Sequence, residues 1–435
     1  MTARVALTAC ALGAVLGCDG RSADLPREVH WSSAHFDYWT RAAETEACPD
    51  ILTPLERHFS TLEGYLGFAW PTGTKVSYYK FTDGKDLTAH GDCPDGAGAC
   101  APGTGVESSA GLDTHELVHA YLYRTGFPPA VLVEGAAVAL SCAAASYAAP
   151  KPTIGWDALA SLAEGSLDVY PPGAWLAAYL LDAYGPGPFL NLYASLPHGA
   201  SAADMDAAFQ AGYGKSLAAI WSAALAEDQP RNTCIWQCSG PPLALDGQPF
   251  DTAGVCGVDT TRPFTLDAEA TVAFTANGGT ALGLGPCGPV TPPAVFVFAI
   301  PTVVTLYHLP AGRYFLENGS TPGTIVGTGD ASATLNHDCA SATDGALLDV
   351  ANVFVAVPRG SDPWYLALPP TPATKPTLAV LPASGDGAAA LCTSCATGAA
   401  CTNLSSQAVD VGAGDIVRLT PDPKHPFSGF EPIWE

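Results

Sequence analysis

The sequence predicts an α+β protein whose first half mixes strands with many helices and whose second half is all β. Three observations indicate this. With 48% hydrophobic and 14% charged residues, the 435-residue chain is typical of packed globular proteins of two or three domains. Residues 106–230 are rich in Ala and Leu, in stretches separated by helix-breaking clusters such as "GFPP" and "YGPGP". After residue 231, alternating runs such as "AVFVFAI" and "VFVAVP" indicate strands.

Residues 29–105 are predicted to form a small α/β unit. "SSAHFDYW" has strand character, and "TKVSYYKF" alternates like a second strand. We expect "HGDCPDGAGACAPGTG", which follows, to be loop throughout. Between the two strands, apolar residues recur at helical spacing after Cys48-Pro49, namely Leu52, Leu55, Phe59, Leu62 and Leu66.

The changes in composition suggest domain boundaries. We expect a signal peptide at 1–17, a lipidated tether at 18–28 and a first domain in two parts, an α/β part at 29–105 and a helical part of the same domain at 106–230. Closely spaced turn signals in the remainder are typical of antiparallel sandwiches, which we place at 231–345, with a second β-rich domain at 346–435.

The first residues resemble an export signal. Arg4 precedes a short apolar run from Val5 to Gly17. The segment "VLGC" is similar to a bacterial lipobox, which implies a lipid on Cys18 and a cell-envelope lipoprotein on the periplasmic or cell-surface face. An ordinary cleaved signal peptide is the alternative. The run is too short to span a bilayer and no later run of eighteen apolar residues occurs, so we expect membrane attachment only through Cys18.

The net charge argues against some classes of function, and the cysteine content indicates the compartment of the protein. A formal net charge of −24 argues against nucleic-acid binding and against an electrostatic hold on anionic lipid. Without Cys10 and Cys18, twelve of the fourteen cysteines remain, an even number suited to disulfides in an oxidising compartment. Cys93 and Cys100 are close enough in sequence to pair. A zinc ribbon would need a second CxxC beside the one at Cys392 and Cys395.

The segment "HELVH" carries the main chemical signal. His115 and His119 are four residues apart, so on a helix their imidazoles lie on one face and can bind one metal ion. Glu116 lies about 100° around the helix, where it can reach a metal-bound water without ligating the metal. Asp113 or Thr114 can cap the start of the helix. The pattern therefore predicts a zinc site at this helix.

A catalytic zinc needs a third protein ligand and an open position for water. After the first helix, Gly126 and two prolines turn the chain, and "VLVEGAAVAL" predicts a second, antiparallel helix that carries Glu134. This short path can return the Glu134 carboxylate to the two histidines. Gly135 leaves room for a close approach.

These segments together resemble the gluzincin metallopeptidases, in particular their peptidase MA-like branch. "YPPGAWLAAYLLDAYGPGPFLNLYASL" and "AFQAGYGKSLAAIW" are similar to later segments of that branch, so the resemblance extends from about residue 30 to 228. It implies a zincin-like domain that hydrolyses protein or peptide substrates. It also implies that His115, His119 and Glu134 bind Zn²⁺, that Glu116 is the general base and that Tyr170 donates to the oxyanion.

One departure from the family pattern keeps two other hypotheses open. Relatives place an acidic residue four positions beyond the ligand glutamate, where this chain has Val138. Val138 favours an inactive zincin-like binding lipoprotein whose β region grips a partner. The third hypothesis is a structural envelope protein with an accidental "HELVH". "GYGKS" is interpreted as a turn, because Phe209 occupies the first glycine position of a phosphate-binding loop.

Overall fold

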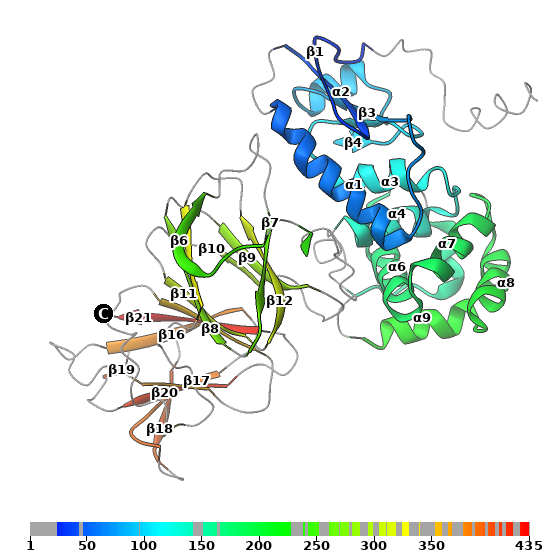
Figure 1. Cartoon of the computed structure of the whole chain (residues 1–435). Helices are drawn as coiled ribbons and strands as arrows, with labels where there is room; N and C mark the ends of the chain where they lie inside the picture. The colour runs from blue at the N-terminus through cyan, green and yellow to red at the C-terminus, as the bar shows by residue number, and fades with distance from the viewer. Residues whose placement is uncertain are drawn as a thin grey trace, which may run out of the picture.

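The structure, a computed structural model, combines helices and strands, so the α+β class is confirmed (Figure 1). The expected signal peptide and Cys18 lie outside the described residues. The structure describes residues 24–42, 47–94, 96–141, 151–162, 166–227, 238–239, 242–251, 261–268, 270–277, 281–287, 295–298, 304–309, 311–318, 324–329, 339, 353–358, 364–367, 377–384, 388–395, 399–404, 409–410, 415–420 and 427–434.

The first sheet has the strand order β1-β2-β3-β5-β4. Its strands are β1 (Val29–Ser32), β2 (Phe36–Thr40), β3 (Val76–Lys80), β4 (Ala99–Cys100) and β5 (Val106–Ser108). The three inner strands β2, β3 and β5 run parallel, while β1 and β4 pair antiparallel at the two edges. The β4 strand lies in the segment expected to be only loop. That expectation is wrong for these two residues, because their pairing with β5 leaves no local signal in the sequence.

Helix α1 (Leu52–Leu66) follows the short helix η1 (Pro49–Ile51) and forms as expected. The last four of its five periodic apolar residues are buried and the first is partly buried. The helix ends at Gly67, whose φ of 76° is left-handed and favours glycine. Helix α2 (Gly84–His90) begins at Asp83, whose side chain accepts hydrogen bonds from two backbone N–H groups.

The helical part surrounds one buried helix, α4 (Ala130–Leu140), in which every residue is buried. Helix α6 (Tyr170–Tyr184) crosses it where two glycines meet. A Cβ atom on Gly135 would lie 2.4 Å from the carbonyl oxygen of Gly173. Gly135 therefore allows the close approach of α6. The other elements here are α3 (Thr114–Leu122), η2 (Trp156–Ser161), η3 (Leu167–Val169), α7 (Pro186–Ser195), α8 (Ala202–Tyr213) and α9 (Leu217–Leu225).

One apolar core joins the first sheet to these helices. Its buried members run from Phe36 in β2 to Ala224 in α9. The core thus spans the expected parts 29–105 and 106–230, as one domain would. Within the described residues, no helix is both long and apolar enough to cross a membrane.

The second half contributes strands to sheets of four, eight and four strands. In Figure 1 these strands lie grouped beside the helical half. Their bounds are β6 (Asp246–Asp251), β7 (Thr261–Leu266), β8 (Ala270–Asn277), β9 (Ala281–Pro286), β10 (Val295–Phe298), β11 (Val304–Leu309), β12 (Gly312–Asn318), β13 (Thr324–Gly329), β14 (Val353–Pro358), β15 (Trp364–Ala367), β16 (Thr377–Ser384), β17 (Ala388–Cys392), β18 (Cys401–Leu404), β19 (Val409–Asp410), β20 (Ile416–Thr420) and β21 (Phe427–Trp434).

The eight-stranded sheet has the order β19-β16-β21-β14-β11-β8-β13-β6 and contains strands from both sides of the boundary expected at 345. It joins the two sides where β11 pairs with β14 in parallel. Disulfides link cysteines within this half, Cys238 to Cys287, Cys339 to Cys395 and Cys392 to Cys401. Both cysteines of the CxxC are thus used in disulfides, which leaves no thiolates there for a zinc ribbon.

Candidate metal centre

The helix that carries "HELVH" is capped by Asp113. The Asp113 Oδ1 atom accepts a hydrogen bond from the backbone N–H of Glu116 at 3.2 Å, in the manner of an N-cap. Thr114 is the first residue of α3, and its hydroxyl donates to the carbonyl oxygen of Ser141 at 3.2 Å. That bond ties the start of α3 to the residue that follows α4. The two helices that carry the candidate ligands are therefore joined at this end.

The loop before α3 is held by side chains from the sheet. Tyr38 and Tyr78 stack with ring centroids 4.9 Å apart, and their hydroxyls donate to the carbonyl oxygens of Gly111 and Ala110. Ser108 donates to the second carboxylate oxygen of Asp113 at 3.1 Å. Strands β2, β3 and β5 thus fix the cap, and the cap fixes where α3 begins.

The three expected ligands converge. His115 Nε2 lies 3.2 Å from Glu134 Oε2, His119 Nε2 lies 3.3 Å from the same oxygen, and the two nitrogens are 3.0 Å apart. Zinc bonds of 2.0–2.1 Å at a tetrahedral angle separate neighbouring ligand atoms by about 3.3 Å. The donor set, two imidazoles and one carboxylate, also fits zinc. These residues could therefore hold a metal ion.

The two Nε2 atoms and Glu134 Oε2 form a triangle, and hydrogen bonds alone satisfy these three atoms poorly. If both Nε2 atoms carry hydrogens and donate to Glu134, two N–H dipoles lie side by side on one oxygen, with their nitrogens only 3.0 Å apart and no acceptor between them. If one nitrogen is bare, it cannot donate to the carboxylate. A cation accepts lone pairs from all three atoms at once, so the geometry suits a metal better than a hydrogen-bonded cluster.

The ionisation of the two glutamates differs. Burial acts to raise the pKa of Glu134, but hydrogen bonds and charge from His115 and His119 outweigh it and lower the pKa to about 2. Burial raises the pKa of Glu116, against the opposing field of the two histidines. Glu134 is thus held as a carboxylate ligand, whereas Glu116 is the more basic carboxylate of the pair.

The remaining predicted residues lie around this triangle. The Tyr170 ring, at the start of α6, has its centroid 5.8 Å from that of His115. Val138 is fully buried in α4. His115 Nδ1 is buried, and the described part of the chain offers it no hydrogen-bond partner. Among the described residues, the acceptor that usually orients a zinc histidine is therefore not found at this nitrogen.

Sequence reasoning missed the residues that place the helices. Tyr38 and Tyr78 enter the sequence analysis only as parts of expected strands, and Gly173 only within a segment that is similar to the family. The signal that could have indicated Gly173 is a glycine in "YPPGAW" that can match Gly135, the glycine after Glu134. One sequence, however, does not show where two helices cross. A second group, Cys93, Cys100 and Glu107, also brings possible ligand atoms together. Its sulfurs are joined in a disulfide, as their spacing suggested.

Comparisons with known proteins neither add nor exclude a family. No family model matches the chain, and no curated protein matches it. Among solved structures, the CUB1-EGF-CUB2 domain of human MASP-1/3 matches with 6% identity and a TM-score of 0.14, over 43% of this chain and 99% of that one. A Momordica charantia 7S globulin matches with 13% identity and a TM-score of 0.13, over 38% and 67%. Scores this low carry no argument about fold or function.

Proposed function

We propose that this protein is a zinc-dependent metallopeptidase with a zincin-like first half, and that it acts outside the cytoplasm. The observation that carries the proposal is the triangle of His115 Nε2, His119 Nε2 and Glu134 Oε2, with sides of 3.0 to 3.3 Å. The sequence pattern that resembles gluzincins supports it. Helices α3 and α4, which the bond from Thr114 to Ser141 joins, carry the three ligand residues, and such a site needs two helices held together in this way.

The residues around the triangle supply the remaining chemistry. Bound zinc would polarise a water molecule and a substrate carbonyl. Glu116, buried beside the two histidines, accepts the proton of that water and passes it to the leaving amine. Tyr170, whose ring centroid lies 5.8 Å from that of His115, would donate a hydrogen bond from its hydroxyl to the oxyanion. The substrate is a protein or peptide, which enters from the side where His115 and His119 remain partly exposed.

The location of the protein belongs to the same proposal. A lipid on Cys18 would hold the enzyme on the periplasmic or cell-surface face of the envelope, with no other membrane contact. The disulfides of the described chain suit an oxidising compartment. Acid hydrolysis of the mature protein followed by fatty-acid analysis would test the anchor, with Cys18→Ala as the control.

The decisive experiment measures zinc and peptide cleavage in the same preparations. Wild-type protein should contain one zinc per chain and cleave a peptide library. Glu116→Gln should retain the zinc and the fold but lose cleavage by about 10²-fold or more, because the general base is gone. His115→Ala should lose zinc. His90→Ala, which removes a histidine with 44% side-chain exposure far from the triangle in sequence, should behave as wild type.

Each outcome has a definite meaning. Absence of zinc in metal-replete wild-type protein would remove the proposal altogether and favour a structural envelope protein. Equal cleavage by wild type and Glu116→Gln would show that the cleavage comes from another source. Stoichiometric zinc without any cleavage would support the second candidate.

The second candidate is an inactive zincin-like lipoprotein that binds a partner. The observation that favours it is the buried His115 Nδ1, which lacks an acceptor within the described residues while Val138 occupies the family's acidic position. A ligand histidine without this support binds metal more weakly. In that case the β-rich half provides the binding surface.

A further inference from the structure

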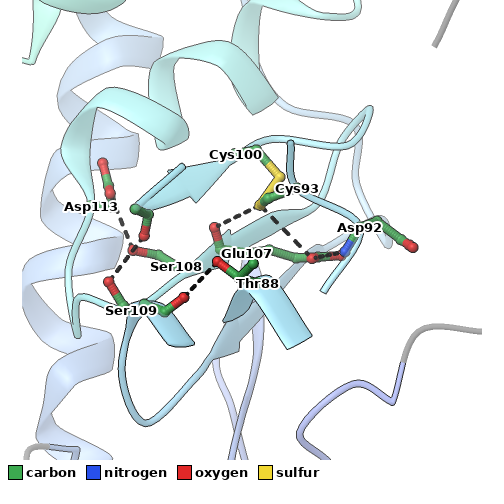
Figure 2. The surroundings of a disulfide bond; sticks show 10 residues. Thr88, Asp92, Cys93, Cys100, Glu107, Ser108, Ser109 and Asp113 are labelled. Atoms are coloured by element: carbon green, nitrogen blue, oxygen red, sulfur yellow. Dashed lines mark hydrogen bonds between the residues drawn. A yellow bond between two sulfur atoms is a disulfide. The ribbon is translucent and has the colours of Figure 1, made fainter. Parts of the chain in front are cut away.

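The Cys93–Cys100 disulfide lies at the edge of the first sheet, against the side chain of Glu107 (Figure 2). Cys100 in β4 pairs with Glu107 in β5. The Cys93 Sγ atom lies 4.0 Å from Glu107 Oε2 and 3.9 Å from the Glu107 carbonyl oxygen. In the oxidised form this sulfur has no hydrogen to donate. After reduction, its thiol would face an acceptor that is already in place.

Glu107 is almost fully buried, which is unusual for a carboxyl group that has no counter-ion among the described residues. Its exposed fraction is 2%, and its Oε2 atom accepts a hydrogen bond from the Asp92 backbone N–H at 2.7 Å. No Lys, Arg or His side chain among the described residues forms an ion pair with it. Burying a carboxylate without a counter-ion is costly, so a purely structural position would be better served by an amide or an apolar group.

The backbone makes space for this carboxyl group. Gly91 precedes the disulfide loop, and a Cβ atom there would lie 2.7 Å from Glu107 Oε2. The glycine therefore leaves room for the acid beside the sulfur. Leu87 of α2 belongs to the small apolar cluster that includes Cys93, and Tyr79 of β3 packs against this cluster. The Cys93 sulfur and the Glu107 carboxyl group thus lie together in a buried, largely apolar environment.

Burial raises the pKa of Glu107, and the negative charge of Asp92 raises it further, against the hydrogen bond from the Asp92 N–H. Among the described residues, the ionisable groups that face it from the neighbouring elements are Asp92, in the loop after α2, and Tyr79, its register partner in β3. The Glu107 carboxyl group therefore keeps its proton to a higher pH than an exposed glutamate does. It can act as a proton donor to a neighbouring atom.

The two cysteine residues differ in exposure. Cys93 is 8% exposed and buried, whereas Cys100 is partly exposed at the sheet edge. A thiolate from outside reaches Cys100 first. The sulfur that leaves is then Cys93, the one beside Glu107. This asymmetry is what thiol–disulfide exchange at a defined site requires.

We propose that Cys93–Cys100 is a redox-active disulfide in which Glu107 is the catalytic proton donor and acceptor for Cys93. The partner is a dithiol, either a small molecule or a protein. One partner thiolate bonds to Cys100 Sγ, the Cys93–Cys100 bond breaks, and its electron pair goes to Cys93 Sγ, which takes the Glu107 proton. The second partner thiolate then attacks the partner sulfur of the mixed disulfide and releases the Cys100 thiolate and the oxidised partner. In the reverse direction, Glu107 takes the proton back.

The test follows each disulfide of the full-length protein in dithiothreitol, by timed alkylation and mass spectrometry of peptides. The Cys93–Cys100 bond should be reduced at least about tenfold faster than Cys238–Cys287 in the same sample. Trapping with a monothiol should place the mixed disulfide on Cys100. Glu107→Gln should slow the reduction of Cys93–Cys100 about tenfold or more, because the leaving thiolate is no longer protonated.

The pH profile separates a proton donor from a structural side chain. We divide the rate of Cys93–Cys100 reduction by the fraction of the reductant that is present as thiolate. In wild type this corrected rate should fall as the pH rises through the pKa of Glu107. In Glu107→Gln it should not fall. Asp157→Asn, which removes an exposed carboxylate in η2, should leave both the rate and the profile unchanged. Equal rates for Cys93–Cys100 and Cys238–Cys287, or a mixed disulfide on Cys93, would overturn the proposal with wild-type protein alone. So would an unchanged or faster rate in a folded Glu107→Gln.

Discussion

At the scale of single residues, a fully buried histidine makes the stability of the first half depend on pH. His58 lies in α1, and its side chain has no exposed surface. Burial and the nearby charge of Arg57 lower the pKa of His58 to about 3. The ring therefore stays neutral in the folded protein between pH 6.5 and about pH 3, a range in which a free histidine becomes charged.

This predicts a loss of stability in mild acid. Below the ordinary histidine pKa of 6.5, the unfolded chain binds a proton at His58, whereas the folded chain does not until about pH 3. The contribution is absent above pH 6.5 and grows as the pH falls, to about 2 kcal/mol of lost stability at pH 5. His58→Leu should flatten this part of the pH dependence of the unfolding free energy, measured by urea titration at pH 7.5 and pH 5.

Comparison with an exposed histidine checks the assignment. His90→Leu should leave the difference between the two pH values as in wild type, since the His90 side chain is 44% exposed. If His58→Leu loses as much stability as wild type between pH 7.5 and pH 5, the acid sensitivity comes from other groups.

At the scale of secondary-structure elements, the crossing of α4 and α6 determines where Glu134 lies. The two backbones approach at Gly135 and Gly173, and a Cβ atom on Gly173 would lie 2.9 Å from the Val131 carbonyl oxygen. Glu134 is adjacent to the crossing, so any separation of the helices moves the carboxylate away from the histidines. The helix periodicity alone could not predict this contact.

Replacement of Gly135 by alanine should therefore destabilise the fold, although alanine is the better helix former. We expect a loss of about 2 to 3 kcal/mol in unfolding free energy, because the added methyl group meets rigid backbone. Zinc affinity should fall together with stability. Both are measured on purified protein, by urea titration and by competition with a zinc-binding dye.

Gly64 provides the matched control within α1. A Cβ atom there would meet nothing within 4 Å, so Gly64→Ala should raise the unfolding free energy by about 0.5 to 1 kcal/mol through helix propensity alone. Zinc binding should not change. Equal effects of the two substitutions would mean that the α4–α6 contact is looser than the structure indicates.

At the scale of the whole molecule, the two halves differ in how far their contacts run along the chain. The core of the first half lies entirely between Phe36 and Ala224. The eight-stranded sheet instead combines strands from 246–329 with strands from 353–434. The first half should thus fold alone, while the second half should not divide at residue 345.

Two truncated proteins test this difference. A fragment of residues 24–227 should be monomeric, unfold cooperatively and bind zinc as the full chain does. A fragment of residues 24–345 should associate, because without β14 the strand β11 becomes an exposed edge of the sheet. Size-exclusion chromatography and zinc titration provide both readouts. A monomeric, folded 24–345 fragment would instead support the domain boundary expected from the sequence.

The sequence by itself determined the features that depend on local spacing. It predicted the class of fold, helix α1, the paired histidines, the helix of Glu134 and the Cys93–Cys100 bond. Each of these follows from the composition of one stretch of the chain or from the spacing of residues within it. It left two cap residues open for α3. It also could not reveal β4, because a two-residue strand exists only through its partner β5.

The tertiary structure decided which of these residues meet. The distances of 3.0 to 3.3 Å between His115, His119 and Glu134 depend on the tyrosines of β2 and β3, on the α4–α6 crossing and on the bond from Thr114 to Ser141. The contact of Glu107 with Cys93 likewise arises from strand pairing and from the space at Gly91. Such contacts are set by packing between distant segments, which no local pattern of residues encodes.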